Sequence, residues 1–243
     1  MEIGVKTDIG RIRDINQDAY YISSHKEHPL FIIADGMGGH KAGEIASRMA
    51  VEIISSRLEK DLKRLELDDS GIKDKIVCSI SKANEKIYRK ALEEEKFSGM
   101  GTTVTLAYKN NEKIFIGHVG DSRAYLFRKG VLSQITKDHS LVEELIRNGS
   151  ISKEEAKLHP QRNIITRAVG TSKEIESDLI VQENNKGDIL LLCTDGLTNM
   201  LMDEEIKEYL LVNEDMQKVC DELVKLSNDK GGYDNITVLA IKF

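Results

Sequence analysis

The sequence has no tryptophan, only two prolines and three cysteines, and only 5% aromatic residues in 243 positions. The cysteines, Cys78, Cys193 and Cys220, are widely spaced and form no C-x-x-C pair. Neither a zinc knuckle nor a disulfide framework is therefore indicated, and we expect reduced thiols, with Cys193 as core filler. The scarcity of aromatic rings also argues against a surface that stacks nucleic-acid bases.

Long apolar runs and clusters of basic residues are also missing. The run Ile189–Cys193 is far shorter than the roughly 18 residues that a membrane-spanning helix needs, and the charged N-terminus does not resemble a signal peptide. The chain carries 41 acidic and 35 basic side chains, a net charge of −6, which does not suit binding to nucleic acid or an anionic membrane. We expect a cytoplasmic protein with neither partner, and a monomer, since no coiled-coil heptads occur.

What is present is an ordinary folding composition, 40% apolar and 31% charged, in a length that suits one domain, 1–243. Apolar runs bounded by turn residues predict strands at 19–23, 30–34, 102–108, 113–119, 124–127, 131–135, 179–182, 189–193 and 236–242. Helical periodicity predicts helices at 42–65, 73–94, 139–148, 152–159, 203–211 and 215–228. Paired helices and runs of strands, without strict alternation, indicate an α+β fold with antiparallel sheets sandwiched by helices. Residues 137–170 look like an excursion from the sheet.

Helical spacing also predicts which faces of the first two helices are buried. For the first helix the stripe comprises Ile45, Met49, Ile53, Ile54, Leu58, Leu62 and Leu65. For the second it comprises Ile76, Ile80, Ala83, Ile87 and Ala91.

Four aspartates stand where apolar runs begin or end, beside glycines or turns: Asp35, Asp121, Asp195 and Asp234. Carboxylates that converge at the rim of a sheet repel one another unless hard cations neutralise them, and such oxygen ligands suit Mg²⁺ or Mn²⁺. Each aspartate alone could equally be a turn or cap residue, but four in the same relation to buried strands favour a metal site.

Two further segments are candidates for phosphate or metal binding. Arg13, near Asp18, has the planar fork that grips phosphate oxygens, although a solvated surface arginine is the alternative. The glycine-rich turn 36–43 is neither G-x-G-x-x-G, because position 41 is Lys41, nor a P-loop. Its glycines either let the backbone approach a metal or phosphate, or form a bare turn.

Eight motifs occur in order along nearly the whole chain. They are Arg13-x-x-Asn-Gln-Asp18, Asp35-Gly-Met-Gly-Gly-His40-x-Ala-Gly-Glu44, Gly99-Met-Gly-Thr-Thr103, Gly117-His-Val-Gly-Asp-Ser-Arg123, Asp138-His-Ser140, Thr166-Arg-Ala-Val-Gly170, Cys193-Thr-Asp-Gly-Leu197 and Gly231-Gly-Tyr-Asp-Asn-Ile-Thr237. Together they resemble the metal-dependent Ser/Thr protein phosphatase family (PPM, type 2C) in its compact bacterial form.

The resemblance implies a fold and a set of roles. The fold would be an antiparallel β-sandwich flanked on both sides by helix pairs, a four-layer αββα arrangement, with residues 137–170 as a helical flap subdomain. Two Mn²⁺ or Mg²⁺ ions, and a third as in similar bacterial members, would be held by Asp18, Asp35, Gly36, Asp121, Asp195 and Asp234. Among these, Asp35 would bridge two ions, Gly36 would use its carbonyl, and Asp121 and Asp195 would hold the third ion. Arg13 would bind the substrate phosphate.

The implied reaction is hydrolysis of phosphoserine and phosphothreonine by a hydroxide that bridges the metals, without a phosphoenzyme. Met37 stands where animal members carry a histidine that resembles a general acid, and Gln17 stands where they carry Glu. His40 could serve as the acid instead, although a metal-bound water or a purely structural His40 are the alternatives. His118 and His139 are expected not to be ligands.

The implied partners are phosphorylated proteins, including a Hanks-type Ser/Thr kinase that the enzyme would oppose in signalling. Two rival hypotheses remain at this point. One is a catalytically inactive phosphatase-like binding module, and the other is a different two-metal hydrolase such as a nuclease, against which the acidic balance counts.

Overall fold

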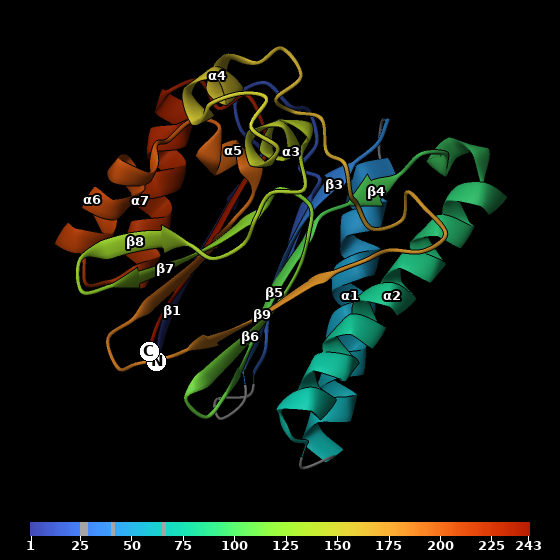
Figure 1. Cartoon of the computed structure of the whole chain (residues 1–243), viewed down its shortest axis with the longest axis horizontal. Helices are drawn as coiled ribbons and strands as arrows, with labels where there is room; N and C mark the ends of the chain where they lie inside the picture. The colour runs from blue at the N-terminus through green and yellow to red at the C-terminus, as the bar shows by residue number, and fades with distance from the viewer. Residues whose placement is uncertain (25–28, 40–41, 65–66) are drawn as a thin grey trace.

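The computed structural model describes residues 1–24, 29–39, 42–64 and 67–243, and consists of two antiparallel β-sheets with helices packed on them (Figure 1). The strands are β1 (Glu2–Asp8), β2 (Asp18–Ile22), β3 (Leu30–Met37), β4 (Gly101–Thr102), β5 (Val104–Asn110), β6 (Lys113–Val119), β7 (Arg123–Arg128), β8 (Val131–Gln134), β9 (Asp178–Glu183), β10 (Ile189–Cys193) and β11 (Ile236–Lys242). The helices are α1 (Ala42–Arg64), α2 (Asp69–Glu93), α3 (Leu141–Arg147), α4 (Lys153–Leu158), α5 (Asp195–Thr198), α6 (Asp203–Val212) and α7 (Met216–Asp229), with a short 3-10 turn at Glu95–Phe97.

The strand order of the first sheet is β1-β11-β10-β7-β8, and that of the second is β2-β3-β5-β6-β9, with β4 paired to β3. Tight turns set the register of the hairpins. In the β7–β8 hairpin Arg128 pairs with Val131, and the two loop residues, Lys129 and Gly130, both have positive φ. That is the twist a two-residue hairpin favours. The predicted α+β class is confirmed.

Three buried clusters hold these elements together. One joins the second sheet to α1 and α2, through residues such as Ile32, Ile54 and Ile80. Another fills the space between the sheets, where Phe31 and Ile33 of β3 face residues of β10 and β11. The third joins the first sheet to α6 and α7. In Figure 1 the pair α1–α2 and the pair α6–α7 lie on opposite sides of the sheets.

The predicted stripe of α2 is buried, but that of α1 is partly wrong. The side of α1 that is fully buried carries Ala42, Ala46, Ala50, Ile54 and Leu58. Ile45, Met49 and Ile53 are only half-buried, at the margin of the same cluster, and the side chains at 62 and 65 lie outside the described residues. Small alanines replace large aliphatics at the contact because α1 lies close against β3.

Other elements escaped the sequence analysis. Strand β1 was not predicted, since its half-exposed pattern has no apolar run, and α5 is a single turn. Helix α2 begins at Asp69 rather than at 73, because the Asp68 side chain accepts a hydrogen bond from the Gly71 N–H and caps the helix. Among the described helices none has both the length and the apolar character needed to cross a bilayer.

Candidate active site

The predicted aspartates come from both sheets. Asp18 begins β2 and lies opposite Asp35 of β3 in the strand register. Asp195 follows β10 and opens α5, and Asp234 stands just before β11. The end of β10 meets the start of β11, since the Thr194 N–H donates to the Thr237 carbonyl. Antiparallel pairing therefore brings together positions separated by about forty residues of chain.

Asp35 is the electrostatic centre of the group. Burial, and then the charges of Asp18, Asp195, Asp121 and Asp234, raise its pKa well above the usual carboxyl value. Four separate carboxylates thus act electrostatically on the Asp35 side chain, so the aspartates singled out in the sequence lie in the same region of the molecule. Such mutual repulsion is costly in a protein interior unless a cation or a proton offsets it.

The neighbouring carboxyls are shifted in the same direction. Burial, assisted by nearby carboxylates, raises the pKa of Asp18 to about 7, that of Asp121 to about 8 and that of Asp195 to about 6. Hydrogen bonds from Thr237 and Thr194 to Asp18 act against this rise. Clusters with such perturbed pKa values are typical of functional sites.

Three of these carboxyls hold an oxygen atom that is buried without a hydrogen-bond partner in the described structure: Oδ1 of Asp18, Asp121 and Asp195. Buried polar atoms are normally satisfied, so each unsatisfied oxygen requires a ligand or another explanation. Oxygen donors of this kind fit Mg²⁺ or Mn²⁺. Within the described ranges, however, no three acidic, His or Cys side chains stand ready around a common centre. Hydrogen bonds from other side chains of the chain orient Asp18 and Asp195.

Arg13 lies at the mouth of this group. Its Nη2 is 2.7 Å from Asp234 Oδ2, and its side chain is 51% exposed. The hydrogen bond from Arg13 to Asp234 is the largest influence on the guanidinium and raises its pKa, with further support from the Asp35 and Asp195 charges. An accessible guanidinium held beside a carboxylate cluster is suitably placed to bind phosphate oxygens.

Gly36 follows Asp35 within β3, and a side chain is impossible there. A Cβ at this position would lie 2.1 Å from the Gly43 carbonyl oxygen. Gly43 is equally constrained, because its own Cβ would lie 2.6 Å from the Gly36 carbonyl oxygen. These glycines therefore allow β3 and the start of α1 to pack backbone to backbone. Close packing within the protein therefore requires both glycines, and the Gly36 carbonyl as a metal ligand stays a prediction.

The three histidines near the motifs stand in different situations. His40 lies outside the described residues, so the structure gives no position for it. His118 is buried in β6, bonded to Thr105 Oγ1 and the Lys137 carbonyl. Burial lowers its pKa to about 4, and its place in β6 is the one predicted for a sheet residue. His139 accepts a hydrogen bond at Nδ1 from the Gly120 N–H, beside Asp121.

Both ends of segment 137–170 are attached next to the carboxylates. At its start the His139 N–H donates to the Gly120 carbonyl. At its end Val169 forms a bridge with Thr102, whose hydroxyl donates to the Asp35 carbonyl at 2.8 Å. Helices α3 and α4 of this segment lie at the upper end of the view in Figure 1.

Several residues that the sequence analysis left without a role orient the carboxylates. The hydroxyls of Thr194 and Thr237 both donate to Asp18 Oδ2, at 2.9 and 2.6 Å, and Asn199 Nδ2 donates to Asp195 Oδ2. Asn235 Nδ2 donates to the carbonyls of Ile9 and Ile15 and so fixes the loop that carries Arg13. Adjacency to Asp195 or Asp234 was the signal available for Thr194 and Asn235.

Comparison with known proteins gives a consistent result. Residues 12–237 match the family model described as "Protein phosphatase 2C". The serine/threonine phosphatase stp of Listeria monocytogenes is 41% identical over 243 residues, covering 100% of this chain and 96% of its own. The protein phosphatase PhpP of Streptococcus pneumoniae is 38% identical, with 99% and 97% covered.

Solved structures agree. The S. agalactiae serine/threonine phosphatase superposes with a TM-score of 0.91 at 41% identity, covering 98% of each chain. The catalytic domain of the phosphatase PstP, solved with two manganese ions, gives a TM-score of 0.86 at 33% identity, with 98% of this chain and 96% of that one covered. The resemblance inferred from the eight motifs is thus confirmed. The chain belongs to the protein phosphatase 2C family, within its group of bacterial serine/threonine phosphatases, which are hydrolases.

Proposed function

We propose that this enzyme dephosphorylates phosphoserine and phosphothreonine in proteins at the carboxylate cluster around Asp35, with two divalent cations, Mn²⁺ or Mg²⁺. The unpartnered buried oxygens of Asp18, Asp121 and Asp195 carry this proposal. Bound there, the cations would neutralise phosphate charge and lower the pKa of a water molecule to near neutrality.

The residue roles follow from position. Asp35 reaches the centre of the cluster from the second sheet, and Asp195 and Asp234 reach it from the first, so these three would hold the cations from both sides. The Gly36 carbonyl and Asp18 would complete the set, and Asp121 with Asp195 would form a third, separate site. Two threonine hydroxyls keep Asp18 Oδ2 turned to the protein, which leaves Oδ1 for the ligand side.

Arg13 would hold the phosphate. In the described arrangement Asp234 occupies one edge of its guanidinium, and phosphate oxygens would bind the remaining N–H groups while charge builds up on them. Segment 137–170, attached at Gly120 and Thr102, would act as the flap beside the bound substrate. The role of His40 as a general acid stays a prediction, as does a cytoplasmic location.

Phosphoproteins are the proposed substrates, including a Ser/Thr kinase that this enzyme would oppose. The alternative of an inactive binding module is not supported, because the relatives are phosphatases and each predicted carboxylate is present. The nuclease alternative has no support either, since the family match is to a protein phosphatase over residues 12–237.

Substitution of Asp35 and Asp234 tests the proposal. We expect Asp35→Asn and Asp234→Asn each to lower kcat by about three orders of magnitude or more, because each removes charge that stabilises the transition state. Phosphate release from p-nitrophenyl phosphate and a phosphothreonine peptide in Mn²⁺ measures this, with calorimetric titration of Mn²⁺ alongside. Asp221→Asn, an exposed carboxylate remote from the cluster, serves as the control. Near-normal turnover in either site variant would refute the assigned ligands.

A further inference from the structure

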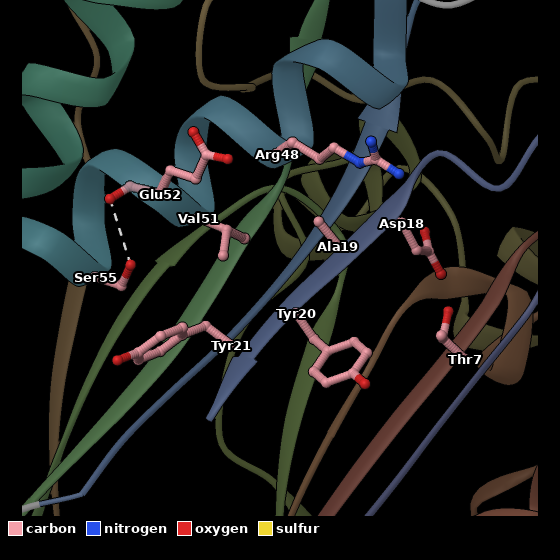
Figure 2. Close-up of a pocket in the computed structure, with 9 residues that line it drawn as sticks. All are labelled: Thr7, Asp18, Ala19, Tyr20, Tyr21, Arg48, Val51, Glu52 and Ser55. Atoms are coloured by element: carbon pink, nitrogen blue, oxygen red, sulfur yellow. Dashed lines mark hydrogen bonds between the residues drawn. The ribbon is translucent and has the colours of Figure 1, made fainter. Parts of the chain in front are cut away.

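A groove of about 440 Å³ opens between α1 and β2. Figure 2 shows Asp18 at one end of it, Arg48 and Glu52 projecting from α1, and Tyr20 on the opposite side of β2. Apart from Asp18, none of its lining residues has a role in the proposed reaction. The groove therefore leads away from the carboxylate cluster along a surface that catalysis itself does not use.

The floor of the groove is an open sheet edge. β2 is the outermost strand of its sheet, and no strand in the described part of the chain pairs with its outer side. The Gly36 N–H donates to the Gln17 carbonyl, and the Ser23 N–H donates to the Leu30 carbonyl. Because antiparallel hydrogen bonds alternate along a strand, the backbone groups of Tyr20 and Ile22 point outward from the sheet, and Tyr20 is one of the residues that line the groove.

The edge strand of the other sheet, β1, has its outward backbone groups partly covered by a side chain. The outward backbone of Val5 in β1 is occupied by the Gln217 side chain, which accepts from the Val5 N–H at 3.1 Å and donates to its carbonyl at 2.9 Å. Proteins commonly block exposed edges in this way, because an open edge recruits another extended chain. The fold thus covers β1 and leaves the edge of β2 open beside the cluster.

Side chains on the two faces of β2 complete the groove. Tyr21 faces α1 and packs on the core, and its hydroxyl donates to Glu59. Tyr20 faces the other way and is 40% exposed. A strand added to β2 would place alternate side chains against α1 and against Tyr20, which is how extended peptides are read at sheet edges.

The charge of the groove favours a basic occupant. Arg48 is paired with Glu44 at 3.0 Å, whereas Glu52 is exposed and has no ion pair within the described structure. Asp18, at the catalytic end, belongs to the proposed cation site and is not counted. The uncompensated charge of the groove is therefore that of Glu52, and it is negative.

We propose that this groove binds an extended, basic segment of the phosphoprotein substrate by strand addition to β2, with Tyr20 and Glu52 as residues that determine substrate specificity. The inference rests on the proposed function, because Asp18 belongs to the proposed cation site. Residues Asp18 to Tyr21 of β2 line the groove, so the lysines or arginines of a strand added there would lie about two to four residues from the phosphorylated residue.

Charge reversal at Glu52 tests the contact. The probes are two dodecapeptides with a central phosphothreonine, one with lysines two and four positions before it and one with lysines two and four positions after it. Glu52→Lys should raise KM about fivefold for one of them, the size expected of an exposed ion pair, and leave kcat unchanged. Hydrolysis of p-nitrophenyl phosphate should not change, because this molecule is too short to extend from the carboxylate cluster into the groove. Asp74→Lys, an equal charge change on an exposed position of α2, is the matched control.

Backbone N-methylation tests strand addition independently of any variant. Methylating alternate amides on the lysine side of the better peptide should raise KM in an every-second-residue pattern, because only amides that face β2 donate to it. The proposal is wrong if KM is insensitive to both changes, or if p-nitrophenyl phosphate and the peptides respond equally to Glu52→Lys. It is also wrong if sedimentation shows a dimer that Glu52→Lys dissociates, because a second copy of the chain would then cover the groove.

Failure of the proposed phosphatase function can be distinguished from failure of the docking proposal. Fluorescence anisotropy of the labelled lysine peptide in the presence of a chelator reports on the groove without turnover. Binding that Glu52→Lys weakens, in an enzyme that hydrolyses no phosphate ester in any divalent metal, would refute the proposed function and keep the docking groove.

Discussion

At the scale of single residues, Asp18 shows how the protein prepares a carboxylate for a ligand. Thr194 and Thr237 bind one of its oxygens, while the other is buried with no partner in the described structure. The two hydroxyls fix the orientation of the side chain and lower its pKa, but burial outweighs them and, with the nearby carboxylates, raises the pKa to about 7. The order along the chain could not show this, because Asp18 and Thr237 are distant in sequence.

Asp188 is a buried carboxylate of the opposite kind, fully partnered and remote from the cluster. Its side chain is 4% exposed, and Arg128 donates to it from Nε and Nη2. Burial disfavours its charged form, but hydrogen bonds from Arg128 and the Asn185 N–H outweigh burial and lower its pKa. Its contribution to stability is therefore complete above the unfolded carboxyl value, about 3.9, and is lost as the pH falls through the lower folded value.

We predict that Asp188→Asn lowers the free energy of unfolding by about 2 to 3 kcal/mol at pH 7. The difference from the wild type should shrink below about pH 4, because the carboxyl is then protonated first in the unfolded state and, at lower pH, in the folded state as well. Urea unfolding at pH 7 and at pH 3 measures both. Glu85→Gln, in an exposed helical ion pair that solvent screens, should leave stability almost unchanged at either pH. A pH-independent loss in Asp188→Asn would contradict the argument.

At the scale of elements, the contact of β3 with α1 explains the error in the predicted stripe. Gly36 and Gly43 bring the two backbones together, and Ala46 and Ala50 continue the close approach along the helix. Periodicity marks large apolar residues as the buried face. A helix pressed tightly on a sheet instead buries its small residues, and the larger ones move to the margins.

A second contact between elements joins helix α2 to the loop around residue 170. Asn84 is 1% exposed, accepts from the Gly170 N–H at 2.7 Å and donates to the Ser172 and Lys173 carbonyls. It thereby ties the helix to the loop that follows segment 137–170. The position lies inside a predicted buried stripe, where the sequence offers no reason for an amide.

We predict that Asn84→Ala destabilises the protein by about 2 to 3 kcal/mol, because three backbone groups lose their partner in a buried place. Thermal and urea unfolding measure this directly. Ser81→Ala, one turn away on the exposed side of α2, should have almost no effect. Equal stability of the two variants would mean that water replaces the amide and that the loop is held by other contacts.

At the scale of the whole molecule, the carboxylate cluster joins the two sheets. Asp18 and Asp35 belong to one sheet, while Asp195 and Asp234 flank strands of the other. Their repulsion works against the packing of the sheets, and a cation bound among them would turn this repulsion into a cross-link.

Mn²⁺ should therefore stabilise the fold. A ligand at a concentration 100 times its dissociation constant adds about 2.7 kcal/mol to the free energy of unfolding. This corresponds to a rise in Tm of about 5 to 10 °C for a protein of this size. Differential scanning calorimetry with a chelator and with Mn²⁺ measures it. Asp195→Asn should reduce the rise while Asp221→Asn keeps it. An unchanged Tm in saturating Mn²⁺ would contradict the cross-link.

The sequence by itself determined the α+β class, most elements, the family and the five acidic site candidates. Apolar runs and helical periodicity indicate the class and the elements, and aspartates beside glycines or turns supply four of the candidates. The family, and Asp18 as a metal-site residue, rest on the resemblance of eight motifs in order along the chain. It missed β1, the alanine face of α1, and the hydroxyls that orient Asp18.

Only the tertiary structure decided how the candidates are arranged. It gave Gly36 a packing role, paired Arg13 with Asp234, and left the edge of β2 open while Gln217 covers that of β1. The physical reason is common to all three. Each depends on which distant segments approach within a few ångströms, and in antiparallel sheets that follows from strand order and register, which no local pattern of residues encodes.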